Sequence, residues 1–177
     1  ITGADPARPE EFLTRMERAL NSGVRLVQLR AHGLIPDGYL RLSQAVQGLC
    51  RTHGANLVLN PPGRMSALPP GDGLHLGSRR LMALHRRPPE YALVGASCHN
   101  AAELRQAEAL GLDYALLSPV MPTASHPDAI PLGWGEFSRL AEPALLPVYA
   151  LGGMGVQDIQ TAKRCGGQGV AAISGLW

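Results

Sequence analysis

The sequence is poor in lysine, cysteine and aromatic residues, and these shortages narrow what the protein can do. Lys163 is its only lysine, and it falls on a predicted helix of the outer layer. Schiff-base catalysis needs a lysine amine beside the reacting carbonyl, so lysine-dependent aldolase chemistry is effectively excluded. The 3 cysteines have no metal-ligand spacing, which is typical of a reduced, cytoplasmic protein.

Several other common signals are missing as well. The chain has no apolar run of membrane length and no signal-peptide pattern. Its formal net charge is +2, and its basic residues are scattered without interleaved aromatic side chains. Neither nucleic-acid nor membrane binding is therefore indicated. Histidine and cysteine pairs lack zinc-site spacing, and Ser97 lacks the glycine-flanked elbow of a serine hydrolase. The expected partner is a small molecule.

The length of 177 residues suits one compact domain with a substantial core. The sequence begins at Ile1 without an initiator methionine and stops at Trp177, directly after a predicted strand. We therefore expect residues 1–177 to be a fragment or the C-terminal domain of a longer chain.

Short apolar runs alternate with helical segments along the whole chain. The expected helices cover residues 9–22, 36–53, 64–68, 100–110 and 134–141, and another begins at 156. The expected strands cover residues 1–3, 24–30, 56–60, 73–77, 91–97, 113–117, 147–151 and 169–173. This alternation predicts an α/β chain with a parallel sheet buried on both faces. Eight repeats favour a closed (β/α)₈ TIM barrel whose eighth helix is short or missing, and an open doubly wound sheet is the alternative.

The most informative stretch is Pro147–Met154, a short apolar strand that runs into Gly152 and Gly153. Adjacent glycines let the backbone approach a ligand, and the helix predicted to follow offers unpaired amide groups to an anion. The strand at 169–173 likewise ends in Ser174 and Gly175. Loops after the last two strands of a barrel commonly bind phosphate. A plain tight turn is the structural alternative.

Read together, the strand ends carry a family resemblance that extends along the whole chain. The segments concerned are Gln28–Arg30, Asn60, Gly73–Gly77, Ser97–His99, Asp113–Tyr114 leading to Pro119 and Thr123, Pro147–Met154, and Val170–Gly175. In this shared order they resemble the thiamine phosphate synthase family, which includes the thiazole tautomerase (TenI-like) branch. The resemblance implies a barrel transferase that joins a pyrimidine diphosphate to a thiazole phosphate, with Mg²⁺ helping the diphosphate to leave.

The chain departs from the family pattern at the positions that carry its chemistry. Pro61 and Arg80 stand where the family has its metal-binding aspartates. Neither replacement offers a hard oxygen ligand, so we expect no bound metal. His32 and His126 replace the lysines that grip the diphosphate, and Pro119 replaces the catalytic histidine of the tautomerase branch. The Mg²⁺-diphosphate half of the site is thus expected to be degenerate, which leaves enzymatic activity open.

The candidate site residues fall into three groups. The resemblance and the turn chemistry together assign the phosphate to Thr123, Gly152, Gly153, Ser174 and Gly175. Further ligand contacts are expected from Gln28, Arg30, Asn60 and Ser97, which end their strands or lie just after them. His99 and His126 are the candidate proton carriers. His75 is expected to hydrogen-bond within the core, and Cys98 to be buried and inert.

These assignments predict a cytoplasmic barrel that binds a thiazole phosphate or thiamine phosphate. Three functions stay open: an altered synthase or isomerase, a non-catalytic sensing or regulatory module, and a phosphate-sugar isomerase of another barrel family. Barrels of the family that the chain resembles occur fused to Nudix hydrolases, so a Nudix domain is the fusion partner we expect. Pairing with a second copy of the chain is also left open.

Overall fold

A computed structural model describes residues 1–3, 8–31, 33–62, 69, 71–124 and 127–175. The chain divides into two compact units. Unit 1 comprises residues 1–75 and 91–93, and unit 2 comprises residues 76–90 and 94–175. The short helix predicted at 64–68 lies outside the described residues.

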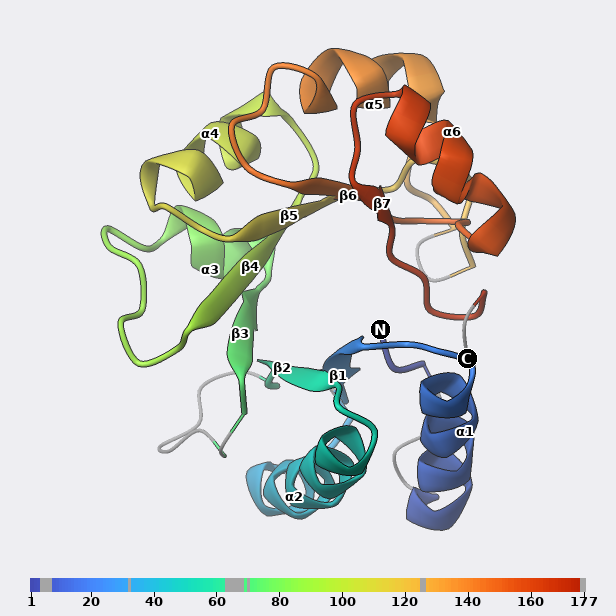
Figure 1. The fold of residues 1–177 in the computed structure, drawn as a ribbon. Helices are drawn as coiled ribbons and strands as arrows, with labels where there is room; N and C mark the ends of the chain where they lie inside the picture. The colour runs from blue at the N-terminus through green and yellow to red at the C-terminus, as the bar shows by residue number, and fades with distance from the viewer. Residues whose placement is uncertain (4–7, 32, 63–68, 70, 125–126, 176–177) are drawn as a thin grey trace. The chain divides into compact units, whose positions relative to one another are not determined.

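Unit 1 carries strands β1 (Leu26–Arg30), β2 (Asn56–Asn60) and β3 (Gly73–Leu76), which pair in parallel in that order. Helices α1 (Pro9–Asn21) and α2 (Pro36–Thr52) lie side by side against them (Figure 1). Both helices begin at a proline, whose fixed φ and missing N–H suit a first helical turn. Proline therefore marks both helix starts in the sequence.

The core of unit 1 forms where the inner faces of α1 and α2 meet the strands. Phe12, Met16 and Leu20 are spaced one helical turn apart on α1, and all three are fully buried. Tyr39 of α2 is also fully buried, and its hydroxyl donates a hydrogen bond to the Leu29 carbonyl of β1 at 3.1 Å. The apolar stripe of each helix thus fixes its orientation.

The strand predicted at residues 1–3 does not form, although the segment follows the edge of β1. The Thr2 amide donates to the Gln28 carbonyl at 2.9 Å. The Arg30 amide donates to Thr2 Oγ1 at 2.9 Å, and the same hydroxyl lies 3.0 Å from the Arg30 carbonyl. A side-chain hydroxyl therefore takes the place of a backbone rung, and too few backbone bonds remain to make a strand.

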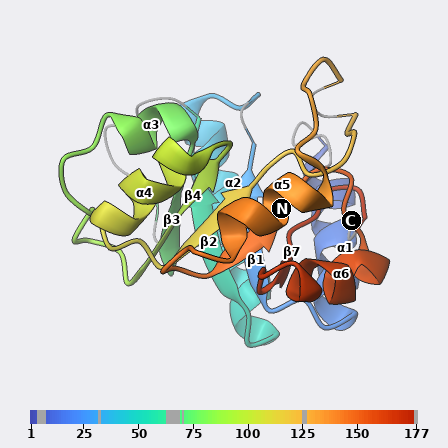
Figure 2. The ribbon, with the colours of Figure 1, turned by 90° about the horizontal axis from the view of Figure 1, so that it is seen from above.

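Unit 2 carries strands β4 (Leu93–Cys98), β5 (Tyr114–Leu117), β6 (Val148–Ala150) and β7 (Gly169–Val170). They pair in parallel in chain order. Helices α3 (Ser78–Met82), α4 (Ala101–Ala109) and α5 (Gly133–Ala141) lie in the connections, and α3 packs beside α4 (Figures 1 and 2). After β6 comes the 3₁₀ turn η1 (Val156–Asp158), which continues as α6 (Ile159–Arg164).

Two helical details differ from the sequence expectation. Residues 78–82 form α3, where only a connection is expected, because five residues are too few to show a helical period. The helix expected from Val156 begins as a 3₁₀ turn and becomes α-helical only at Ile159. Helix starts commonly take 3₁₀ geometry, so the sequence period placed this helix correctly but not its first turn.

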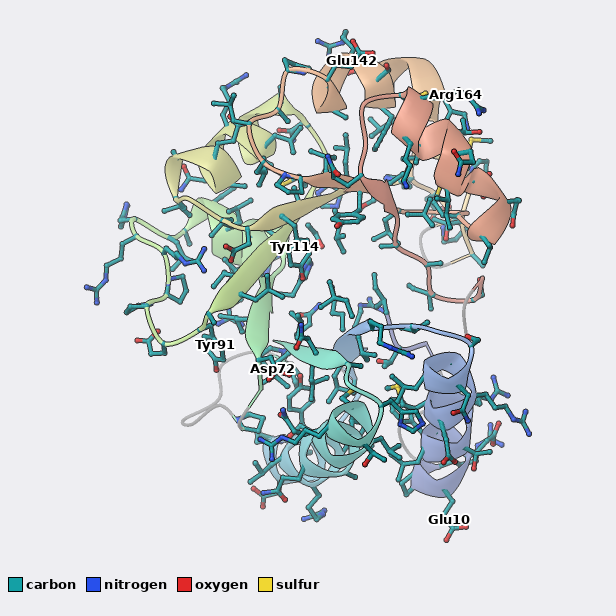
Figure 3. All side chains as sticks on the ribbon, in the orientation of Figure 1. Glu10, Asp72, Tyr91, Tyr114, Glu142 and Arg164 are labelled. Atoms are coloured by element: carbon teal, nitrogen blue, oxygen red, sulfur yellow. The ribbon has the colours of Figure 1, made fainter. Side chains whose placement is uncertain are left out.

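An aspartate at the amino end of a strand accepts a backbone hydrogen bond from the preceding strand at two places. Asp72, directly before β3, accepts a hydrogen bond from the Leu57 amide of β2 at 2.7 Å (Figure 3). Asp113, directly before β5, accepts one from the Val94 amide of β4 at 2.6 Å and one from Arg87 at 2.7 Å. Each carboxylate satisfies an amide of the preceding strand, which helps to hold neighbouring strands in register.

The α/β class with parallel strands in chain order is confirmed within each unit. The described residues contain 7 strands, all short and largely buried. A closed barrel of eight strands stays a prediction.

Candidate functional site

A cavity of about 180 Å³ opens in unit 2 at the carboxyl ends of β5, β6 and β7. It is lined by Pro122, Thr123, Ala124, Leu151, Gly152, Gly153, Met154, Ala172, Ile173 and Ser174. Four of the five residues predicted to bind phosphate therefore lie around one cavity. The fifth, Gly175, follows its wall in the chain.

Gly152 and Gly153 take backbone conformations that side chains rarely adopt, with φ of +97° and +69°. A Cβ on Gly152 would lie 2.8 Å from the Pro119 Cα, and one on Gly153 would lie 2.7 Å from the Pro122 carbonyl oxygen. The loop after β6 can thus press against the loop after β5 only because both residues lack a side chain. These glycines serve the fold as well as the cavity.

Backbone hydrogen bonds hold the base of the loop after β5 on two sides. The amides of Val120 and Met121 donate to the carbonyls of Leu151 and Gly152 at 2.8 and 3.1 Å. The carbonyls of Pro119 and Val120 accept from the amides at 132 and 133 at 2.8 and 2.9 Å. Thr123 therefore projects from a fixed base, and its place in the cavity wall is set by the backbone.

The helix start after Gly153 contributes less than its position in the sequence predicts. The Gly155 amide donates to Asp158 Oδ2 at 2.9 Å, so the carboxylate of the same turn satisfies this group. A Cβ on Gly175 would lie 2.4 Å from the Met154 carbonyl oxygen, which explains glycine there by close packing. The Gly155 amide is therefore not a candidate donor to an anion.

His99 follows β4 and belongs to a hydrogen-bonded pair. Its Nδ1 lies 2.9 Å from Glu103 Oε2, and its backbone amide donates to the same oxygen at 2.7 Å. The capping residue of α4 is Asn100, whose side chain accepts from the Glu103 amide at 3.0 Å. The pairing of Glu103 with the His99 ring was not predicted, although the spacing of four residues at a helix start could have indicated it. Ser97 lies half-buried on β4.

In unit 1 the predicted ligand residues lie at the ends of β1 and β2. Asn60 Nδ2 donates to Gln28 Oε1 at 3.2 Å, and the Gln28 side chain is buried. Arg30, which pairs in register with Asn60, is exposed. His32 and His126, for which the sequence predicts a role, lie outside the described residues.

Burial makes several reactive side chains inert. His75 is fully buried, and desolvation lowers its pKa to about 3, so it is neutral at ordinary pH. Burial also raises the pKa of the Cys98 thiol to about 12 and that of Cys50 to about 11. The prediction that Cys98 is buried is confirmed, and neither thiol is a candidate nucleophile.

The donor set does not fit a magnesium ion. Pro61 is buried and has no side-chain oxygen, while Arg80 is exposed on α3 and carries a positive charge. Within the described residues, no three His, Cys, Asp or Glu side chains lie close enough together to hold a metal. Mg²⁺ requires several oxygen ligands, which the positions holding Pro61 and Arg80 do not provide.

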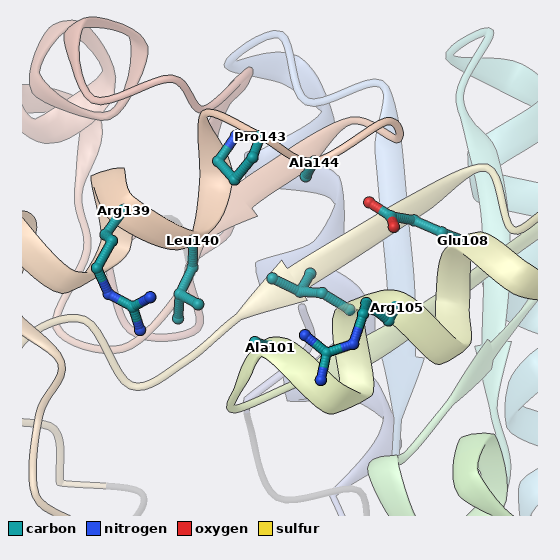
Figure 4. Close-up of a pocket in the computed structure, with 8 residues that line it drawn as sticks. Ala101, Arg105, Glu108, Arg139, Leu140, Pro143 and Ala144 are labelled. Carbon is teal, nitrogen blue, oxygen red and sulfur yellow. The ribbon is translucent and has the colours of Figure 1, made fainter.

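A second, larger cavity of about 290 Å³ lies on the helical layer of unit 2, between α4 and α5 (Figure 4). Its charged side chains are Arg105, Glu108 and Arg139, and the rest of its lining is apolar. Glu108 accepts from the Leu145 amide at 2.9 Å, and Arg139 is paired with Glu136. This groove contains no histidine, cysteine or hydroxyl group, so it is not a catalytic candidate.

Comparison with known proteins identifies relatives of this chain by sequence and by fold. Residues 1–176 match the family model described as thiamine monophosphate synthase. The chain is 34% identical to a putative thiamine-phosphate synthase 2 of Aquifex aeolicus, covering 93% of this chain and 89% of that protein. It is 38% identical to the thiamine biosynthesis bifunctional protein ThiM/ThiE of Symbiobacterium thermophilum, covering 91% of this chain but 34% of that protein.

The structural comparison concerns the fold. Thiamine phosphate pyrophosphorylase from Pyrococcus furiosus superposes with a TM-score of 0.75 at 23% identity, covering 92% of this chain and 79% of that one. In the part of the chain that the structure describes, no helix has the length and hydropathy needed to span a membrane. On the match along its whole length, the chain belongs to the thiamine monophosphate synthase family.

Proposed function

We propose that the chain binds a thiazole phosphate or thiamine phosphate through the cavity at the carboxyl ends of β5, β6 and β7, within a closed (β/α)₈ barrel. The observation that carries the proposal is the meeting of Thr123, Gly152, Gly153 and Ser174 around one cavity. These residues lie on three separate segments that the sequence singles out independently.

The chemistry of the cavity wall suits a phosphate monoester. Thr123 and Ser174 carry hydroxyl groups, and the exposed Gly153 presents its backbone without a side chain. Hydroxyls and backbone amides bind phosphate without a metal. A volume of about 180 Å³ is below the range of roughly 300–1,000 Å³ typical of pockets for whole drug-sized ligands. The cavity therefore suits the phosphate end of the molecule.

The remaining candidate residues extend this proposal to the rest of the ligand and to proton transfer. Ser97, in the same unit as the cavity, is proposed to contact the rest of the ligand, and ligand contacts from Gln28, Arg30 and Asn60 stay predictions from the sequence. His99 or His126 would carry protons in an altered synthase or isomerase. Because the positions of the metal ligands hold Pro61 and Arg80, no coupling step through Mg²⁺ is proposed.

The missing metal ligands also favour a second function, a non-catalytic sensing or regulatory module. Such a module would retain the phosphate cavity without the groups that activate a diphosphate. We expect it to be fused to another enzyme, such as a Nudix hydrolase. The Symbiobacterium relative, whose name describes a bifunctional protein, shows that chains of this family occur within longer proteins.

Calorimetric titration tests the proposed function. Thiazole phosphate, thiamine phosphate and the pyrimidine diphosphate are titrated into the protein, each with and without Mg²⁺. We expect the two monophosphates to bind equally well in both buffers and the diphosphate to show no metal-dependent binding. Ser174→Ala should weaken the monophosphates about 2- to 10-fold through loss of one hydrogen bond. Thr52→Ala, which removes an exposed hydroxyl of α2, is the matched control. Metal-dependent binding of the diphosphate would contradict the proposal.

A further inference from the structure

The pair formed by His99 and Glu103 is more than a helix cap. Glu103 Oε2 accepts the His99 backbone amide at 2.7 Å and lies 2.9 Å from Nδ1 of the same residue. One carboxylate oxygen therefore holds both the backbone and the ring of His99. The Glu103 side chain is 16% exposed and that of His99 is 42% exposed, so the carboxylate is sheltered while the ring reaches solvent.

The identity of the partner determines which ring nitrogen carries the proton. An ionised carboxylate has only acceptor sites, so the group facing it at 2.9 Å must be a donor. In the neutral imidazole only one nitrogen is protonated, and a donor facing the carboxylate requires that nitrogen to be Nδ1. The lone pair then remains on Nε2, whereas a histidine in water prefers to place its proton there.

The position of His99 brings this lone pair to the functional end of unit 2. His99 directly follows Cys98, the last residue of β4, and the strands of this unit are parallel. The segments after β5, β6 and β7 line the 180 Å³ cavity. His99 thus leaves the sheet at the same end as the cavity-forming loops.

We propose that Glu103 is a positioning residue that fixes neutral His99 as the Nδ1–H tautomer, so that Nε2 accepts a hydrogen bond from an N–H or O–H group of the bound phosphorylated ligand. The ligand contact rests on the proposed function, whereas the tautomer assignment does not.

A purely structural role of Glu103 would leave the tautomer of His99 independent of Glu103. Asn100 provides the matched control for this alternative. Asn100 caps α4 by accepting from the Glu103 amide at 3.0 Å, and it makes no hydrogen bond to the His99 ring. Asn100→Ala should destabilise the protein by about 0.5–2 kcal/mol, as for loss of a helix cap. It should leave the tautomer of His99 unchanged.

The test is nitrogen NMR of the histidine rings in the full chain, at a pH where His99 is neutral. His99→Gln identifies the signals of His99. We expect Nδ1 of His99 to give the shift of a protonated nitrogen and Nε2 that of an unprotonated one, both in the wild type and in Asn100→Ala. In Glu103→Ala the two shifts should exchange. A wild-type ring protonated mainly on Nε2 would overturn the tautomer assignment without any mutation.

Titration with thiamine phosphate, whose aminopyrimidine offers N–H donors, tests the ligand contact. Glu103→Ala should weaken binding about 2- to 10-fold, and Asn100→Ala should leave it unchanged. Equal affinity in the wild type and Glu103→Ala would overturn the contact. A wild type that shows the expected tautomer but binds no thiamine phosphate would overturn the proposed function and the contact, while the tautomer assignment would stand.

Discussion

At the scale of single residues, His75 connects burial to the pH dependence of stability. It is fully buried in β3, and desolvation lowers its pKa from 6.5 to about 3. Between these values the unfolded chain binds a proton that the folded chain does not. The free energy of unfolding therefore rises with pH, by up to about 1.4 kcal/mol per pH unit. This contribution is complete above about pH 6.5 and is lost as the pH falls toward 3.

We expect His75→Gln to flatten this dependence. Denaturant unfolding at several pH values between about 3 and 6.5 should give a smaller slope of unfolding free energy against pH in the variant than in the wild type. Comparing slopes separates the titration from any loss of packing. His85→Gln, at an exposed position in unit 2, should retain the wild-type slope. Equal slopes in His75→Gln and the wild type would show that His75 is protonated in the folded state.

At the scale of elements, the junction between the loops after β5 and β6 organises the cavity. The Val120 and Met121 amides bond to the Leu151 and Gly152 carbonyls, and the two loops touch where the glycines lack a Cβ. Thr123 and Gly153 face one cavity because of this contact. A change at the junction should therefore affect both the fold and ligand binding.

Gly152→Ala should lower the free energy of unfolding by about 1–3 kcal/mol or more. The new Cβ would lie 2.8 Å from the Pro119 Cα, and the φ of +97° is unfavourable for alanine. Gly48→Ala is the matched control, because its Cβ would meet no heavy atom within 4 Å in the interior of α2. This control should be stabilised by roughly 0.5–1 kcal/mol. Denaturant titration compares the two, and a Gly152→Ala variant as stable as the wild type would show that the loops are not in close contact.

The elements themselves were largely predictable from the sequence. Prolines mark the starts of α1 and α2, Asn100 caps α4, and apolar runs coincide with β1 to β7. The secondary-structure prediction was wrong where an element is too short to show a helical period, as in the five-residue α3. The prediction of a strand at residues 1–3 was also wrong, because the Thr2 hydroxyl takes the place of a backbone hydrogen-bonding group there. Hydrogen bonds of this kind, between a side chain and a distant strand, produce no hydrophobic periodicity in the sequence.

At the scale of the whole molecule, the site was predictable where it depends on backbone turns and unpredictable where it depends on side-chain pairing. Strand ends and small residues indicated the cavity of Thr123, Gly152, Gly153 and Ser174. The bonds from Glu103 to His99 and from Asn60 to Gln28 appear only in three dimensions, because many partners suit each polar group. Family membership does not by itself establish an activity.

The most direct test of a phosphate site at the ends of β5, β6 and β7 is to follow the backbone amides of the labelled protein by NMR while thiazole phosphate is added without metal. We expect the largest shift changes at Gly152, Gly153 and residues 172–174, which line the 180 Å³ cavity. The groove between α4 and α5 provides an internal comparison, and the amides of Leu140 and Ala144 there should be unaffected. Changes confined to that groove, or none at Gly152 and Gly153 at saturating ligand, would contradict a phosphate site at the ends of β5, β6 and β7.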